Sequence, residues 1–274
     1  MPELPEVETV RQTLKQLVLN KEIKDVSIYW DNIIKRPLEP MDFKAWLQGQ
    51  RLIDIERKGK FLIFQFSDIS MVSHLRMEGK FGLYDSSLPK PKHTHVVFQF
   101  TDGSELRYDD VRKFGTMHLF QKGEEWKEKP LNLLGPDPFD PLFTVDYFYN
   151  KLQKTSRHIK AVLLDQSVVA GLGNIYVDEA LYRARIHPER TAKELNYGEA
   201  ARLKEASTET ILEAVKKGGT TIRTYLNGQG EMGMFQQELK VYGKENIDCV
   251  ECGTPILKLK VSGRGTHICP QCQQ

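Results

Sequence analysis

The chain opens with apolar residues at helical spacing and then changes to short alternating runs. Val7, Val10, Leu14, Leu17 and Val18 fall on one face of a helix, which predicts an amphipathic helix over about residues 3–19. Eight β-type runs follow, at 23–29, 51–57, 61–66, 71–75, 81–84, 95–100, 105–108 and 116–120. Many short strands with turn signals between them are typical of a β-sandwich.

A proline-rich segment at 131–143 separates this strand-rich part from a helical one. Periodic apolar faces predict helices over 147–152, 159–164, 175–183 and 199–217, and Gly218-Gly219 ends the last of them. Residues 218–235 then combine five glycines with little apolar periodicity. A loop of this length inside a compact domain is usually functional or disordered.

The pattern predicts an α+β multidomain protein. We expect an N-terminal β-sandwich domain with an N-terminal helix over residues 1–130, a linker over 131–143, a helical domain over 144–236, and a separate C-terminal segment over 237–274.

Composition adds few constraints. The net charge of +2 argues neither for nor against a polyanionic partner, so binding to nucleic acid would need local basic clusters. Candidates are 57–60, 112–113, 154–160 and 258–264, although each is also compatible with a solvated surface. The sequence has neither the apolar run of ~18 residues that spans a bilayer nor a secretory signal pattern. We therefore expect a soluble intracellular protein.

All four cysteines lie near the end of the chain. Cys249 and Cys252 form one C-x2-C pair, and Cys269 and Cys272 form another sixteen residues later. This spacing predicts a zinc ribbon with four thiolate ligands, which leave no open coordination position and indicate a structural Zn²⁺. Disulfides are the alternative, but they would require an oxidising compartment. Between the pairs, 256–261 alternates like a strand, and 262–265 predicts a hairpin turn that presents Arg264.

Two further segments have both a chemical and a structural interpretation. Removal of Met1 would leave Pro2 with a free secondary amine, and a terminal amine titrates near ~8 where lysine titrates near ~10.4. Such an amine can form a Schiff base with a carbonyl-like carbon; the simpler interpretation is a proline in the first turn of a helix. Gly171-Leu-Gly173-Asn174 can bind phosphate through exposed N–H groups, or it can be an ordinary turn between packed helices.

Five motifs together resemble bacterial formamidopyrimidine-DNA glycosylases. They are Met1-Pro-Glu-Leu-Pro-Glu-Val-Glu8, Ser73-His-Leu-Arg-Met-Glu-Gly79, Asp110-Val-Arg-Lys-Phe-Gly115, Gly171-Leu-Gly-Asn-Ile-Tyr-Val-Asp-Glu179 and the four-cysteine ribbon. The motifs occur in the family's order and cover the whole chain. The resemblance implies a β-sandwich, a helix–two-turns–helix domain and a zinc finger that together bind double-stranded DNA.

The resemblance also implies an activity and the residues that perform it. The family removes 8-oxoguanine and formamidopyrimidines and then cuts the strand as an AP lyase. By resemblance, Pro2 is the nucleophile, Glu3 the acid–base group, and Lys60 and Arg264 assist elimination. Met77, Arg112 and Phe114 match the trio that fills the space left by the everted base; without the resemblance, Met77 and Phe114 would more often be core residues.

Other residues match DNA-contacting positions of the family. Phosphate contacts are implied for His74, His93, Asn174 and Tyr242, and a DNA contact is implied for Lys160. The glycine-rich loop at 218–235 resembles the segment that closes over the lesion, with Thr220, Thr221, Arg223 and Thr224 at the oxidised edge. One departure is Ser156, where several relatives carry lysine; Arg157 or Lys154 could take over that contact.

Two other functions remain open from the sequence. One is the sister glycosylase for oxidised pyrimidines, which shares the terminal proline, the glutamate and the ribbon; Leu4 and the trio favour the purine enzyme. The other is a DNA-binding zinc protein without catalysis. In each case we expect a bacterial cytoplasmic monomer.

Overall fold

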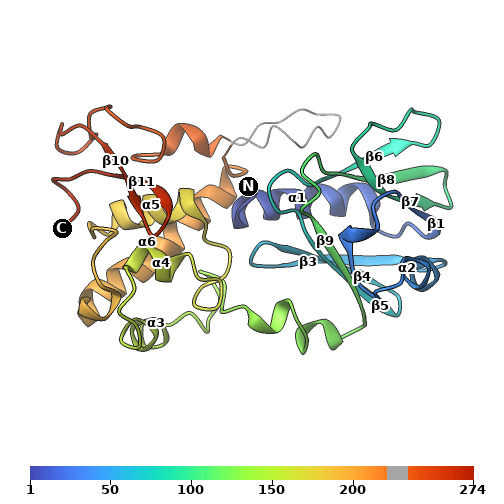
Figure 1. Ribbon diagram of the computed structural model, residues 1–274, viewed down its shortest axis with the longest axis horizontal. Coiled ribbons are helices and arrows are strands. Elements are labelled where there is room, and N and C mark those ends of the chain that lie inside the picture. The colour runs from blue at the N-terminus through green and yellow to red at the C-terminus, as the bar shows by residue number, and fades with distance from the viewer. Residues whose placement is uncertain (221–233) are drawn as a thin grey trace. The chain divides into compact units, whose positions relative to one another are not determined.

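The computed structural model describes residues 1–220 and 234–274, which form two compact units (Figure 1). The first unit contains Met1–Pro2 and Glu6–Asn132, and the second contains Glu3–Pro5, Leu133–Thr220 and Met234–Gln274. None of the helices in these residues has both the length and the apolar character needed to cross a membrane.

The first unit is built from two sheets and two α-helices. Within its described residues, one sheet has four strands in the order β1-β7-β8-β6, and the other has five in the order β2-β9-β5-β4-β3. The helices are α1 (Leu4–Val18) and α2 (Pro40–Leu47), and the strands are β1 (Ile23–Ile28), β2 (Ile34–Arg36), β3 (Leu52–Lys58), β4 (Phe61–Phe66), β5 (Ile69–His74), β6 (Lys80–Asp85), β7 (Thr94–Phe100), β8 (Ser104–Asp109) and β9 (Thr116–Gln121).

One apolar core holds these elements together. It includes the predicted face of α1, where Val7, Val10 and Leu14 are almost fully buried, together with residues of both sheets. Phe64 on β4 and Phe81 on β6 pack edge to face across the two sheets, with ring centroids 5.2 Å apart. The predicted helix and the β-sandwich are thereby confirmed.

The second unit is helical and ends in a small hairpin. Its helices are α3 (Val145–Leu152), α4 (Ile159–Leu163), α5 (Asn174–Arg183) and α6 (Tyr197–Lys216), and strands β10 (Leu257–Val261) and β11 (Arg264–Ile268) pair antiparallel. Short 3-10 turns occur in this unit at Ala192–Glu194 and Phe235–Glu238, in the first unit at Asp31–Ile33 and Glu124–Trp126, and at the sequence boundary between the units at Leu131–Leu133. The four predicted helices are present. A capping box between Asn196 and Glu199 starts α6, so the helix begins two residues earlier than predicted and ends one residue earlier.

Residues 135–138 of the predicted linker are buried, and Pro136 O accepts a hydrogen bond from Ala170 N at 2.9 Å. One predicted feature differs from the structure. The hairpin turn consists of Ser262 and Gly263, both at positive φ, as a tight two-residue turn requires. Arg264 is therefore the first residue of β11, paired with Val261, rather than part of the turn.

Candidate active site and zinc centre

Glu3 is held against the N-terminus of α5. Its side chain is only 3% exposed, and its Oε1 accepts a hydrogen bond from Ile175 N at 3.2 Å. A Cβ at Gly173 would overlap the carboxyl group of Glu3, and one at Gly171, where φ is +98°, would overlap Leu4. The two glycines thus leave room for the N-terminal residues. The N-terminus of α5 favours a carboxylate, and here the chain supplies that carboxylate itself.

Pro2 directly precedes this anchored carboxylate. Its side chain is half-buried, and Met1 is exposed. Because Met1 is present, the Pro2 nitrogen is an amide in this structure. Its role as a free amine therefore remains a prediction.

Lys60 and His74 lie at the end of the β4–β5 pair. Phe61, next to Lys60, pairs with His74 in register, and their rings meet edge to face at 4.5 Å. Both Lys60 and His74 are largely buried. Burial, followed by the charges of Arg76 and Lys60, lowers the pKa of His74 to about 3. His74 Nδ1 accepts a hydrogen bond from Arg76 N at 2.9 Å, so His74 is neutral and is not a cationic phosphate ligand.

Met77, Arg112 and Phe114 line one cavity of about 640 Å³ in the first unit. Met77 is 40% exposed and Phe114 is 51% exposed, so neither is a core residue. The Arg112 guanidinium lies 4.8 Å from the centre of the Phe114 ring. The rest of the lining comprises Met1, Trp30, Asn32, Lys35, Arg76, Lys113 and Gly115.

Asp110 shapes the loop that carries two of these residues. Its carboxylate accepts hydrogen bonds from Arg112 N at 3.0 Å, and from Phe114 N and Gly115 N at 2.8 Å each. The Asp110 N–H donates to the carbonyl of the half-buried His93 at 3.0 Å. Asp110 belongs to a motif quoted above, but the sequence does not predict that it shapes the loop. A carboxylate within two residues of the basic pair Arg112-Lys113 could equally lie in an exposed turn.

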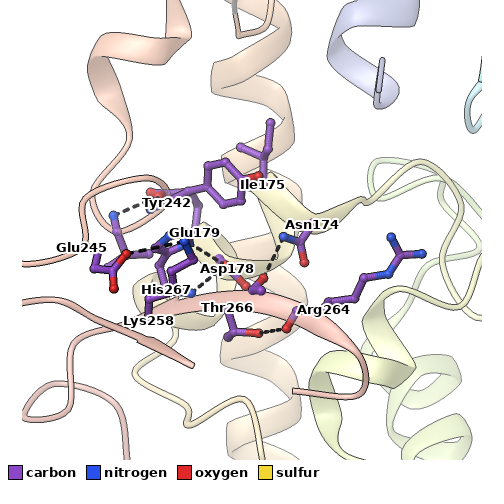
Figure 2. A network of polar contacts seen from close by, with 12 residues as sticks. Asn174, Ile175, Asp178, Glu179, Tyr242, Glu245, Lys258, Arg264, Thr266 and His267 are labelled. Atoms are coloured by element: carbon purple, nitrogen blue, oxygen red, sulfur yellow. Dashed lines mark hydrogen bonds and ion pairs between the residues drawn. The ribbon is translucent and has the colours of Figure 1, made fainter. Parts of the chain in front are cut away.

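In the second unit, α5 contacts the C-terminal hairpin through a buried polar network (Figure 2). Asn174 Nδ2 donates to Gly265 O at 2.9 Å. Asp178 accepts from Lys160 Nζ at 2.6 Å and from His267 N at 2.9 Å. Lys160 Nζ also donates to Thr266 Oγ1 at 2.7 Å and to Gly265 O at 3.2 Å.

The placement of Lys160 corrects an expectation. Its side chain and that of Asp178 are both fully buried, so Lys160 does not present its charge on the surface for the DNA contact that the resemblance implied. Instead it connects α4 to β11, the strand that begins with the exposed Arg264. Burial lowers the pKa of Lys160, while Asp178 opposes that shift.

Glu179 holds a second segment that the sequence did not single out. Its carboxylate accepts hydrogen bonds from the backbone N–H groups of Lys240, Val241 and Tyr242 at 2.8–2.9 Å. Burial raises the pKa of Glu179 even though these three donors oppose the shift. The half-buried Tyr242 packs against His267, with ring centroids 5.0 Å apart.

Thr220 is buried, and its N–H donates to Tyr176 Oη at 3.3 Å. Thr221, Arg223 and Thr224 lie outside the described residues.

The four cysteine sulfurs all lie within 4.8 Å of one another. The Cys249–Cys272 pair is 4.0 Å apart and the Cys252–Cys269 pair 3.4 Å apart. These separations exclude disulfides, in which sulfurs are about 2.05 Å apart. They suit a tetrahedron with Zn–S bonds of about 2.3 Å, whose sulfurs are about 3.8 Å apart. The four cysteines thus form one structural zinc site, as predicted.

Comparison with known proteins agrees with this geometry. Three family models match the chain: the formamidopyrimidine-DNA glycosylase N-terminal domain over residues 1–117, its H2TH domain over 134–226, and the zinc finger found in FPG and IleRS over 248–274. Formamidopyrimidine-DNA glycosylase of Cytobacillus firmus is 60% identical over 273 residues, covering 100% of both chains. That of Bacillus licheniformis is 58% identical over 274 residues, again covering 100% of both chains.

Solved structures give the same result. A Lactococcus lactis FPG mutant in complex with DNA containing Fapy-dG has a TM-score of 0.93 and 41% identity, with 100% of both chains covered. The Lactococcus lactis protein in complex with abasic-site DNA also has a TM-score of 0.93 and 41% identity, with 99% of each chain covered. By these matches, the chain belongs to the formamidopyrimidine-DNA glycosylase family.

Proposed function

We propose that this protein excises oxidised purines from duplex DNA and then cleaves the strand, through a Schiff base on the Pro2 nitrogen after removal of Met1. The observation that carries the proposal is the fixed carboxylate of Glu3, one residue from Pro2. The relatives support it: they are formamidopyrimidine-DNA glycosylases, and solved neighbours hold DNA with Fapy-dG or an abasic site. These relatives are bacterial proteins, which fits the expected cytoplasmic setting.

The proposed reaction has two stages, base excision and then strand cleavage. The Pro2 amine attacks sugar C1′, the bond from C1′ to the base breaks, and the base leaves with a proton. Glu3 protonates the ring oxygen as the sugar opens, which gives an iminium at C1′. The iminium acidifies C2′–H, so a proton leaves C2′ and the 3′ phosphate departs. A second elimination removes a proton from C4′ and releases the 5′ phosphate, and water then hydrolyses the imine to free the Pro2 amine. In this proposal Lys60 and Arg264 assist the eliminations.

The cavity lined by Met77, Arg112 and Phe114 supports the base-eversion step. A base must leave the stack before its sugar can be attacked. An apolar thioether and a phenyl ring can occupy the vacated space, and a guanidinium can hydrogen-bond the orphaned cytosine. The exposure of these side chains keeps them available for this role.

Borohydride trapping tests the proposal. Protein lacking Met1 should form a covalent adduct with a duplex that contains 8-oxoguanine or an abasic site, and peptide mass spectrometry should place the sugar on Pro2. Protein that retains Met1 is the matched control and should form none. An adduct on another residue, or no adduct, contradicts the mechanism, and the latter would favour a DNA binder without catalysis. Preference for thymine glycol opposite adenine over 8-oxoguanine opposite cytosine would favour the pyrimidine enzyme.

A further inference from the structure

One stripe of side chains on α5 contacts the zinc finger, residues 237–274, at three points along the helix. Asn174, Asp178 and Tyr182 are four residues apart, so they lie on the same face of the helix. Asn174 and Asp178 bond to the backbone of Gly265 and His267, respectively, as Figure 2 shows for this part of the network. One turn further on, Tyr182 Oη lies 3.2 Å from Cys249 Sγ. The stripe therefore ends at the metal ligands.

The surroundings of Tyr182 fix its ring. Its side chain is 5% exposed and packs with Val241, Cys249, Ile256 and Cys269 in one apolar cluster. In the zinc-bound finger, Cys249 is a thiolate without a proton, and a tyrosine hydroxyl carries one at neutral pH. Tyr182 is therefore the donor and the sulfur is the acceptor.

We propose that Tyr182 is a positioning residue for the zinc site, whose hydroxyl supports the Cys249 thiolate and connects the metal to α5. Four thiolates around one Zn²⁺ carry an excess negative charge of two, and a hydrogen bond from outside the coordination sphere disperses part of it. The same bond fixes the direction of the Cys249 sulfur. This inference concerns retention of the metal, so it does not depend on the proposed reaction.

Zinc release from the intact holoprotein measures this role. Tyr182→Phe keeps the buried ring and removes only the hydroxyl. Loss of such a partner typically weakens metal binding about 10–100-fold, so a colorimetric chelator should remove zinc from the variant at least ~10-fold faster than from the wild type. Tyr197→Phe is the matched control: the Tyr197 hydroxyl donates to Asp146 at 2.7 Å on the exposed surface of the same unit. It should release zinc at the wild-type rate.

A spectroscopic readout separates a hydrogen bond from a packing effect. In the cobalt-substituted protein, Tyr182→Phe should shift the sulfur-to-cobalt charge-transfer band to lower energy, because a thiolate without its hydrogen bond gives up electrons more readily. Faster zinc release together with a shifted band supports the proposal. An unchanged release rate, an unshifted band, or equal acceleration in Tyr197→Phe overturns it.

Discussion

At the scale of single residues, the close approach of Glu3 explains why position 173 is a glycine. The backbone of Gly173 has an ordinary extended φ of −129°, so the residue is not required for its conformational freedom. It is required for space, because any Cβ would occupy the position of the Glu3 carboxyl group. The sequence suggested a phosphate loop as one interpretation of these glycines, but the group they accommodate belongs to the chain.

Glu3→Gln should separate binding from chemistry. Glutamine fits the same space and its Oε1 can still accept from Ile175 N, but its amide supplies no acid proton. We expect single-turnover excision of 8-oxoguanine to fall at least ~100-fold, with lesion-duplex affinity, measured by fluorescence anisotropy, almost unchanged. Glu205→Gln, on the exposed face of α6, is the control and should excise normally. Normal excision by Glu3→Gln would remove Glu3 from the mechanism.

His74 should make the protein less stable in acid. Its folded pKa of about 3 lies below the usual ~6.5, so between these values the unfolded chain binds the additional proton. As the pH decreases from 6.5, protonation of His74 in the unfolded chain should therefore lower the free energy of unfolding by about 1.4 kcal/mol per pH unit. Urea titrations from pH 7 to pH 4 should show a shallower decline for His74→Asn. Equal slopes for the two proteins would contradict the assigned pKa.

At the scale of elements, α5 is the helix on which the C-terminal segment depends. Its side chains bond to the hairpin, to the segment at 240–242 and to a zinc ligand. The sequence predicted the helix because its apolar positions recur regularly. It could not predict the bonds, since the spacing of polar residues along one helix carries no information about partners some 60–90 positions away.

Asp178→Asn should loosen this helix from the hairpin. The change leaves the Lys160 ammonium buried without its counter-charge, which typically costs about 3–5 kcal/mol. Unfolding of the second unit, followed by urea titration, should show this loss. Glu238→Gln is the control, because its ion pair with Lys217 is exposed and typically contributes about 0–1 kcal/mol.

The pH dependence of that variant gives a second check. Without Asp178, the pKa of Lys160 falls further, and the neutral amine avoids the cost of a buried charge. The stability difference from wild type should therefore shrink as pH rises toward ~10, the ordinary range for lysine. A difference that stays constant from pH 7 to pH 10 would mean that the loss does not come from the charge of Lys160.

The misses in the sequence analysis have physical causes. β2 has three residues and α2 has eight, too few to establish a period, although Phe43 and Leu47 of α2 are buried four positions apart. Lys160 was grouped with DNA-binding cations because its charge is visible in the sequence and its buried carboxylate partner is not. The zinc ligands and α1 were predicted correctly because each depends on local spacing alone.

At the scale of the whole molecule, the two units have separate cores. No residue of the finger belongs to the apolar cluster of the strand-rich unit, as far as the described residues show. Cysteines of the finger pack in a small cluster with Tyr182, Val241 and Ile256. Its fold must therefore depend largely on the metal.

Removal of zinc should consequently abolish DNA binding before it unfolds the strand-rich unit. After chelation, we expect affinity for an abasic duplex to fall, because the phosphate contacts made through the finger are lost, while the β-sheet signal in circular dichroism is retained. Restoring zinc should recover binding, which controls for irreversible damage. An apoprotein that binds the abasic duplex as tightly as the holoprotein does would show that the finger does not contribute to DNA binding.

The stripe of α5 also limits how this chain can be recombined with zinc ribbons from outside its family. A finger transplanted from another protein would bring its own hairpin backbone and cysteines. The donors and acceptors that contact them, however, belong to residues 174–182 of α5. Exchange of the last forty residues alone would leave this interface mismatched. Chimeras should therefore inherit the helix and the finger together, as a single module joined through space rather than through sequence.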